Sequence, residues 1–329
     1  MIREFGPADV MRLEEVPTPE PGPNEVLVKV AAVSVNRTLD IIVRNGKYPR
    51  PVKLPHVLGV DPTGTVVALG ANVTKRKIGD RVCISSRRAA RGSGPMVMLG
   101  IDSWGGYAEY VPLHEDIAHP IPDDLDFQTA TVVARHAPLA FNLVRAKAQL
   151  KEGDWALVMG AAGGLGSLIV QAARFYGANV IAAAGADSRV EVARELGAQH
   201  GINYRTQDLT AEVMKLTDKR GVDVVFENIA DPDLFPKALA SIRRGGKLLT
   251  AGAHGGPIVP LNVSLLYMNG LSVIGTTEHT VEDVAAALDA ATQKRLKVLI
   301  DKVLPLSEVR EAHRIVDSRE GAGKVLLIP

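Results

Sequence analysis

The stretch Asp154-Trp-Ala-Leu-Val-Met-Gly-Ala-Ala-Gly-Gly-Leu-Gly166 decides how this chain folds. Its apolar run, 155–159, predicts a buried strand, and the glycines after it predict a tight turn. A helical pattern over 167–176 and a second strand-like run over 179–184 complete the spacing of a βαβ unit. Such glycines let a pyrophosphate approach main-chain N–H groups at the N-terminus of the following helix. The stretch therefore predicts a dinucleotide site; the alternative is a strand-to-helix turn without a ligand.

Bulk properties place the chain among ordinary globular proteins. It has 329 residues, enough for two domains, of which 46% are hydrophobic and 23% charged. The net charge of +1 gives no basic surplus that would favour nucleic acid. Cys83 is the single cysteine, which excludes an internal disulfide framework and a multi-cysteine zinc site. Residues 1–5 form no apolar signal region and no run is long enough to span a membrane, so we expect a cytoplasmic protein.

Two patterns divide the chain near residue 135. Before about residue 130, β-branched runs such as 25–33 alternate with turns and predict a β-rich part. After residue 135, strand-like runs alternate with helical patterns, which predicts a parallel, doubly wound sheet. In this second part we expect a helix capped by Ser188 and ended by Gly197. We also expect a helix over 234–242 that is closed by Gly245-Gly246.

Motifs along nearly the whole chain resemble those of one family. In order, they include Pro19-Glu-Pro-Gly-Pro-Asn-Glu-Val-Leu-Val28, Leu58-Gly-Val-Asp-Pro-Thr-Gly64, Gly105-Gly-Tyr-Ala-Glu-Tyr-Val111, the glycine-rich stretch and Gly323-Lys-Val325. Their order and spacing are similar to those of the medium-chain dehydrogenase/reductase superfamily, in its zinc-independent, quinone oxidoreductase-like branch.

The resemblance implies an α/β fold with two domains. A GroES-like, β-rich catalytic domain is expected over residues 1–134 and 279–329. A Rossmann domain with a doubly wound parallel sheet is expected over 135–278 and interrupts it. The resemblance also implies a homodimer that pairs through the edge of the Rossmann sheet, near residues 271–276.

The family pattern places no good zinc ligands in this chain. The first ligand position of the zinc-dependent members falls on Asn36, their His-Glu pair on Val60-Asp61, and a third ligand near Arg135. Valine cannot ligate a metal, and arginine stays protonated. Residues 86–103, where the structural zinc lobe lies, contain no cysteine. We therefore expect no zinc, which disfavours a standard alcohol dehydrogenase. A makeshift site remains open from His56, Asp61 and His136.

Cofactor contacts are expected along the glycine turn and at the ends of two later strands. Along the turn the candidates are Gly160, Ala162, Gly163, Gly164, Leu165 and Gly166. Asn228 and Gly252 follow successive predicted strands and should lie by the nicotinamide.

The phosphate preference depends on the end of the second Rossmann strand. That strand ends Ala182-Ala-Ala-Gly185, without the acid that NAD enzymes use to hold the ribose. In related NADPH-dependent quinone reductases, the positions matching Arg189 and Tyr204 contact the 2′-phosphate, and an arginine fork suits a phosphate. Asp187 supports the alternative, because it could rotate onto the ribose hydroxyls and repel a phosphate. We favour NADPH over NADH.

The resemblance matches Asn36, Asp40 and Tyr48 to the quinone-reductase pocket. Asn36 can donate to a substrate oxygen, and Tyr48 can donate a proton or stack on a flat substrate. Asp40 would orient the loop. Arg135 would stabilise an enolate or bind a substrate carboxylate, or it would pair with a nearby acid. We expect hydride transfer to a quinone or an α,β-unsaturated carbonyl, with oxyanion stabilisation by these groups.

Other functions stay open on the sequence alone. Arg87, Arg88 and Arg91 could contact an anionic substrate, which would suit an enoyl-CoA-type or carboxylate-bearing alkene reductase, although a solvated basic loop is the simpler explanation. An alcohol dehydrogenase homologue would need a metal, or chemistry carried by Arg135 and His136. An NADPH-binding sensor or structural protein is the non-enzymatic alternative.

Overall fold

The computed structural model describes residues 1–84, 87–88, 97–318 and 323–329, which form two compact units. The first unit comprises Met1–Arg135, Ala287–Lys294 and Val298–Pro329. The second comprises His136–Ala286 and Arg295–Lys297. The domain boundaries expected from the sequence remain a prediction. No helix in these described residues combines the length and the apolarity that crossing a bilayer requires.

The second unit contains the predicted doubly wound sheet. Its six strands are all parallel, in the order β10-β9-β8-β11-β12-β13. This is the Rossmann order, in which the strand sequence reverses between the first and the fourth strand. β8, β9 and β11 are buried almost throughout, as their β-branched and alanine-rich runs require when helices cover a parallel sheet. The strands are β8 (Trp155–Met159), β9 (Asn179–Ala184), β10 (His200–Asn203), β11 (Val222–Glu227), β12 (Ile242–Thr250) and β13 (Ser272–Gly275).

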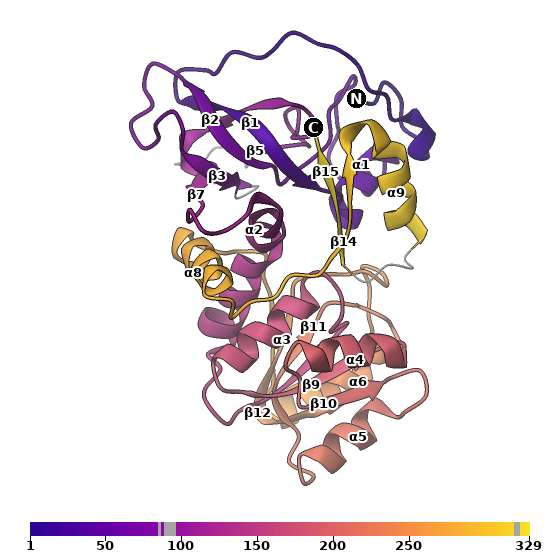
Figure 1. Cartoon of the computed structure of the whole chain (residues 1–329). Helices are drawn as coiled ribbons and strands as arrows, with labels where there is room; N and C mark the ends of the chain where they lie inside the picture. Colours follow the sequence, from indigo (N-terminus) through magenta and orange to yellow (C-terminus); the bar gives the residue numbers. More distant parts are fainter. Residues whose placement is uncertain (85–86, 89–96, 319–322) are drawn as a thin grey trace. The chain divides into compact units, whose positions relative to one another are not determined.

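Helices run beside these strands, as Figure 1 shows for α3 to α6. They are α3 (Gly166–Phe175), α4 (Asp187–Glu195), α5 (Leu209–Leu216), α6 (Leu234–Ala240) and α7 (Val263–Met268). Two local predictions are wrong. Ala186, not Ser188, precedes α4 in the cap position, and it offers no side-chain acceptor. Gly245 and Gly246 do not end α6; they lie inside β12, where a side chain on Gly246 would meet the Asp223 carbonyl.

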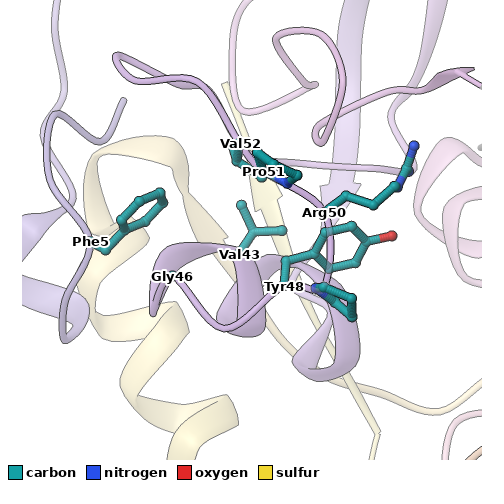
Figure 2. Close-up of a pocket in the computed structure, with 8 residues that line it drawn as sticks. Phe5, Val43, Gly46, Tyr48, Arg50, Pro51 and Val52 are labelled. Carbon is teal, nitrogen blue, oxygen red and sulfur yellow. The ribbon is translucent and has the colours of Figure 1, made fainter.

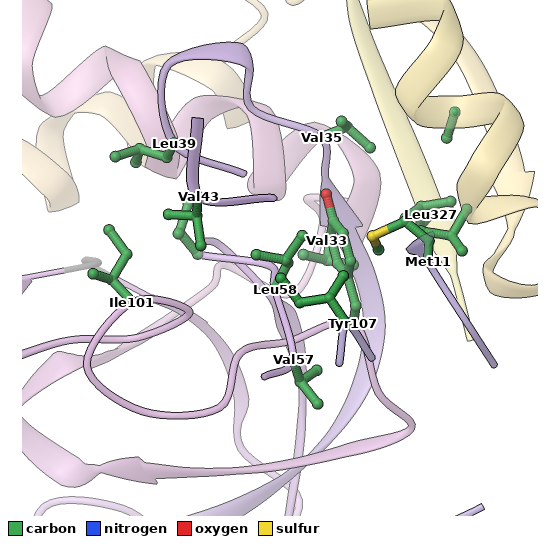
Figure 3. Close-up of a cluster of buried hydrophobic side chains, with 14 of the residues drawn as sticks. Met11, Val33, Val35, Leu39, Val43, Val57, Leu58, Ile101, Tyr107 and Leu327 are labelled. Carbon is green, nitrogen blue, oxygen red and sulfur yellow. The ribbon is translucent and has the colours of Figure 1, made fainter. Parts of the chain in front are cut away.

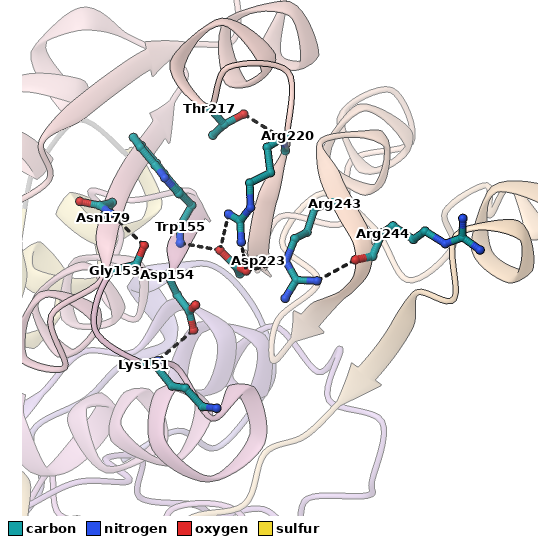
Figure 4. Close-up of polar contacts among 11 residues, drawn as sticks. Lys151, Gly153, Asp154, Trp155, Asn179, Thr217, Arg220, Asp223, Arg243 and Arg244 are labelled. Atoms are coloured by element: carbon teal, nitrogen blue, oxygen red, sulfur yellow. Dashed lines mark hydrogen bonds and ion pairs between the residues drawn. The ribbon is translucent and has the colours of Figure 1, made fainter.

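A buried acid ties the amino-terminal ends of the central strands together (Figure 4). Asp223 of β11 is 4% exposed and accepts hydrogen bonds from the Trp155 backbone N–H (2.8 Å) and from both terminal nitrogens of Arg220. Arg243 of β12 also donates to it. Burial acts to raise the pKa of Asp223, but these hydrogen bonds outweigh it and leave the pKa lowered. The contact therefore clamps β8, β11 and β12 at the sheet end opposite to the glycine turn.

The first unit is built on a seven-stranded, mostly antiparallel sheet in the order β14-β15-β1-β2-β3-β7, with β6 also paired to β1. In the described part of this unit, a two-stranded ribbon and two α-helices accompany the sheet. The strands are β1 (Glu25–Ser34), β2 (Thr63–Leu69), β3 (Arg81–Ile84), β4 (Arg87–Arg88), β5 (Val97–Met98), β6 (Tyr110–His114), β7 (Ala118–Pro120), β14 (Ile300–Pro305) and β15 (Lys324–Ile328). The helices are α1 (Ile42–Arg44) and α9 (Val309–Ser318). Two further helices, α2 (Phe127–Asn142) and α8 (Val281–Thr292), carry residues of both units.

A hydrophobic cluster joins the end of β1 to β15 and to two loops of the first unit (Figure 3). Val33 of β1 pairs in register with Leu327 of β15, and both are fully buried. Leu58 and Tyr107 pack into the same cluster from the loops that follow α1 and precede β6. This core holds the loop that begins at Asn36, which matters for the polar residues described next.

Candidate active site

The glycine turn has the form that a pyrophosphate cradle needs. Gly160 leaves β8 with a φ of +65°, and the Gly163 N–H donates to its carbonyl at 2.9 Å. A Cβ on Gly166 would lie 2.2 Å from that carbonyl, so a side chain there does not fit. Gly163 and Gly164 are exposed, whereas Ala162 and Leu165 are half-buried. α3 begins at Gly166, so its N-terminus and an accessible backbone face the same turn.

The carboxyl end of β11 carries a buried donor that needs an acceptor. Asn228 is 5% exposed, and its Nδ2 has no hydrogen-bond partner within the described residues. A Cβ on Gly252 would lie 3.0 Å from the Asn228 carbonyl, so the two predicted residues are neighbours. Buried N–H groups almost always have a partner in folded proteins. A bound nicotinamide cofactor, whose polar groups include acceptors, would supply one, and the residues present therefore fit it.

Basic and phenolic groups surround the end of β9. A Cβ on Gly185 would lie 3.0 Å from Tyr204 Oη and 3.3 Å from Arg205 Nε. Burial raises the pKa of Tyr204, and the charges of Arg205 and Arg189 oppose this rise. Arg189, Tyr204 and Arg205 therefore lie close together. Sequence reasoning missed Arg205, although it directly follows Tyr204.

The acid beside this cluster has a partner of its own. Asp187, the first residue of α4, accepts a hydrogen bond at 2.8 Å from Nδ2 of Asn203 at the end of β10. The Asn203 side-chain oxygen in turn accepts from the Arg205 backbone N–H at 3.1 Å. Asn203 thus binds the Asp187 carboxylate, which would repel a bound phosphate. It also holds the backbone of Arg205, whose guanidinium would attract that phosphate.

A buried polar cluster follows β1 in the first unit. Asn36 is 2% exposed, and its Nδ2 donates to Asp61 Oδ2 (2.9 Å) and to Ser34 Oγ (3.1 Å). Ser34 also donates to Asp61 through its hydroxyl and its backbone N–H. On the other side, the Lys324 ammonium of β15 donates to Asn36 Oδ1 at 2.6 Å. The structure therefore engages both amide hydrogens of Asn36 inside the protein.

Asp40 lies next to this cluster and is fully buried. Its two oxygens accept from the backbone N–H groups of Asn36 (2.8 Å) and Gly59 (2.9 Å). Burial, reinforced by the charge of Asp61, raises the pKa of Asp40 to about 6. Burial likewise lowers the pKa of Lys324 to about 8; the charge of Arg135 adds to this, while Asp61 and Asp40 oppose it. Arg135, which is half-buried on α2, is thus close enough for its charge to act on Lys324.

These residues do not suit a zinc ion. The side-chain oxygen of Asn36 already accepts a hydrogen bond from the Lys324 ammonium, and Val60, which is fully buried, has no atom that could ligate a metal. His56 is within hydrogen-bonding distance of the Gly100 carbonyl at 2.9 Å, and Asp61 is engaged by Ser34 and Asn36. No group of three His, Cys, Asp or Glu that could hold a metal occurs among the described residues. His136 belongs to the second unit.

Tyr48 lines a cavity of about 360 Å³ (Figure 2). The other lining residues are Phe5, Val43, Gly46, Pro49, Arg50, Pro51 and Val52. The Arg50 guanidinium lies 5.7 Å from the centre of the Tyr48 ring and pairs with Asp102 at 3.0 Å. The structure thus brings Asn36 and Asp40 together, but it places Tyr48 at a cavity that neither of them lines.

The predicted basic loop is only partly described. Arg87 and Arg88 form β4 and pair with β5 in antiparallel register. Arg91 lies outside the described residues.

Comparisons with known proteins agree with this architecture. A family model for the alcohol dehydrogenase GroES-like domain matches residues 22–123, and one described as zinc-binding dehydrogenase matches residues 164–293. The chain is 31% identical to the quinone oxidoreductase of Pongo abelii over 333 residues, which cover 99% of this chain and 96% of that protein.

Two solved structures resemble the whole chain. One is described as an NAD-dependent alcohol dehydrogenase, with a TM-score of 0.92 and 32% identity, and the match covers 100% of this chain and 98% of that one. The other is a quinone oxidoreductase of Escherichia coli in complex with NADPH, with a TM-score of 0.85, 26% identity and the same coverage. The chain belongs to the medium-chain dehydrogenase/reductase superfamily, in its quinone oxidoreductase-like branch, and is an NAD(P)H-dependent oxidoreductase.

Proposed function

We propose that this protein is a zinc-independent, NADPH-dependent reductase of quinones or α,β-unsaturated carbonyls. The observation that carries the proposal is the group of Arg189, Tyr204 and Arg205 at the end of β9, beside an Asp187 that is engaged by Asn203. Two guanidinium groups and a phenol suit a 2′-phosphate, because charge-assisted hydrogen bonds from arginine forks are strong and directional. The NADPH complex of the Escherichia coli relative supports this choice.

The second unit would bind and orient the cofactor. The N-terminus of α3 and the exposed backbone of Gly163 and Gly164 would hold the pyrophosphate. The orphaned Nδ2 of Asn228 would donate to the nicotinamide end, beside Gly252. A bound nicotinamide supplies the hydride, and these contacts decide where its reactive carbon lies.

Residues of the first unit would serve the acceptor. Negative charge develops on the acceptor oxygen as it is reduced, so it needs donors or a positive charge. Because both amide hydrogens of Asn36 are engaged, we assign Asn36 and Asp40 to the support of the site. Arg135 would provide fixed positive charge, and the Tyr48 hydroxyl or water would provide the proton. Tyr48 lines a cavity large enough for a small flat molecule.

We further propose that the protein is a homodimer through β13. This strand lies at the edge of the parallel sheet, and its Val273 is 40% exposed. Tyr267 and Met268 of the preceding α7 are 70% and 65% exposed. An open strand edge in a unit that exposes large apolar side chains favours pairing with a second copy of the same edge.

A binding titration followed by an acceptor screen tests the proposed function. Wild type and the variants Arg189→Ala and Arg205→Ala are titrated with NADPH and with NADH, and cofactor fluorescence is followed. Arg194→Ala is the control, because Arg194 lies on α4 together with Arg189. We expect each of the first two variants to weaken NADPH binding about tenfold or more and to leave NADH binding unchanged. Equal binding of both cofactors, insensitive to these variants, would contradict the NADPH assignment.

The screen then offers quinones, enones, acyl-CoA thioesters and, in the reverse direction, alcohols. Turnover of quinones or enones that Tyr48→Phe slows supports the proposed reaction. Turnover of acyl thioesters alone would favour the alkene reductase, and turnover of alcohols would favour a dehydrogenase. Tight NADPH binding without any turnover would favour a sensor or structural protein.

A further inference from the structure

Lys324 is a buried lysine that the expected chemistry does not use. It is the first residue of β15 and is only 9% exposed. Its ammonium is 2.6 Å from Asn36 Oδ1 and 3.5 Å from the Val35 carbonyl. Lysine is almost never buried unless it is paired, because removing an ammonium from water is costly. The position therefore demands an explanation.

The contacts of Asn36 allow only one orientation of its amide. The oxygen faces the Lys324 ammonium, while Nδ2 faces Asp61 Oδ2 and Ser34 Oγ. Turning the amide over would set its NH₂ against the ammonium and its oxygen against a carboxylate. Both contacts would then be repulsive inside a site with little water to screen them.

The same amide is linked to the backbone that carries Asp40. The Asn36 backbone N–H donates to Asp40 Oδ2, and Gly59 donates to the other oxygen of Asp40. Charges balance over this group, because the cations Lys324 and Arg135 oppose the acids Asp40 and Asp61. Without Lys324, the two buried carboxylates of Asp40 and Asp61 would lose one of the positive charges that oppose them.

We propose that Lys324 is a positioning residue for reduction of the acceptor. Its ammonium locks the Asn36 amide in one orientation between itself and Asp61, and this lock holds the segment from Asn36 to Asp40 in its working geometry. The inference rests on the proposed function only for its kinetic consequence, because the lock itself is a property of the first unit.

Two substitutions and a matched control test the role. Lys324→Met removes the charge, Lys324→Arg keeps it, and Lys302→Met removes an exposed lysine from the neighbouring strand β14. For Lys324→Met we expect kcat for the acceptor to fall tenfold or more, while the Kd for NADPH stays within twofold of wild type. Lys324→Arg should recover a large part of kcat, and Lys302→Met should behave as wild type. An unchanged kcat in Lys324→Met would overturn the inference.

A double variant separates positioning from simple charge balance and guards against a single variant that does not fold. Lys324→Met combined with Asp61→Asn removes one charge of each sign. The double variant should therefore recover the thermal stability that the single variant Lys324→Met loses. It leaves the amide of Asn36 free to turn, so kcat should stay low. Recovery of kcat together with stability would show that Lys324 only balances charge, and the inference would fail.

Hydrogen exchange provides a readout that needs no turnover. Deuterium uptake of peptides spanning residues 34–46 should rise in Lys324→Met and stay at the wild-type level in Lys302→Met. If wild type reduces no acceptor, the proposed function fails, yet this uptake still decides whether Lys324 holds the segment. Equal uptake in both variants would overturn the inference by itself.

Discussion

At the residue scale, Asn203 decides where the Asp187 carboxylate points. Its Nδ2 holds that carboxylate at 2.8 Å, and its side-chain oxygen holds the Arg205 backbone. An acid at the start of α4 would otherwise be able to accept from ribose hydroxyls, as in NAD enzymes. The neighbouring asparagine would thus account for the proposed preference for NADPH in a chain that still carries an acid nearby.

Removing this side chain should shift the preference toward NADH. In Asn203→Ala the carboxylate is released, so we expect NADPH to bind several-fold more weakly and the ratio of NADPH to NADH affinity to fall. The double variant Asn203→Ala/Asp187→Ala should restore most of the ratio, because the repelling charge is gone. Fluorescence titration of both cofactors measures the ratio, and no change in Asn203→Ala would contradict the argument.

His313 shows how burial fixes a protonation state. It is fully buried on α9, and its Nδ1 lies 3.1 Å from the Arg44 guanidinium, so the ring must accept there and stay neutral. Its Nε2 has no hydrogen-bond partner in the described part of the chain. Burial, with a contribution from the charge of Arg44, lowers the pKa of His313 to about 3.

This histidine should make the protein less stable in acid. Between the ordinary histidine pKa of 6.5 and about 3, the unfolded chain binds a proton that the folded chain does not. The free energy of unfolding should therefore fall as the pH falls through this window, by at most about 1.4 kcal/mol per pH unit from this group.

Urea unfolding of wild type and His313→Asn at several pH values measures the effect. Asp40 acts in the opposite direction. Its pKa is raised from the ordinary value of 3.8 to about 6, so its contribution to the free energy of unfolding falls as the pH rises between these two values. The difference between the two proteins isolates His313, since Asp40 is present in both. His254→Asn is the control, because His254 is exposed. If the free energy of unfolding depended on pH in the same way in wild type and in His313→Asn, the lowered pKa assigned to His313 would be refuted.

At the scale of the element, the turn from β8 into α3 depends on one close approach. The Gly160 carbonyl lies where a Cβ of residue 166 would have to be, so the helix can begin only if that residue is glycine. Gly164 differs, because its added Cβ would meet only the ring of His136 at 3.3 Å.

Alanine at these two positions should therefore have unequal effects. Gly166→Ala must displace the backbone, and we expect a loss of stability of about 1–3 kcal/mol together with weaker binding of both NADPH and NADH. Gly164→Ala should keep nearly wild-type stability. Thermal unfolding and fluorescence titration check both statements, and equal melting temperatures for the two variants would contradict them.

At the scale of the whole molecule, two sheet edges carry exposed valines, and we expect only one of these edges to pair with a second copy of the protein. Val273 lies on β13, at one edge of the parallel sheet, whereas Val303 lies on β14, at an edge of the other sheet, and is 38% exposed. Charges on an edge strand prevent pairing with another chain. If two copies join through β13, only one of these edges is an interface.

Lysine substitutions should distinguish these edges. We expect Val273→Lys to convert the proposed dimer to a monomer and Val303→Lys to leave that dimer intact. Light scattering coupled to gel filtration gives the mass directly. A monomeric wild type, or a dimer that survives Val273→Lys, would reject the proposed interface.

Much of the fold was predictable from local sequence. The run from Trp155 to Met159 matches β8 without a change of bounds, because a short apolar run closed by glycine has few alternatives. The glycine pair 245–246 misled the prediction, since glycine also occurs inside strands where another backbone passes close. The start of α4 also differed, because Ala186 offers no side-chain signal.

The sequence by itself determined the family, the doubly wound sheet and the position of the glycine turn, because each is marked by motifs whose own residues are close together in the chain. Only the tertiary structure decided how Asn36 is held, since Lys324 reaches it from 288 residues away. The same holds for Asp187 and Asn203, which meet only because β9 and β10 pair in the sheet. Side-chain charges act over a few ångströms, and such distances between remote residues arise from packing alone.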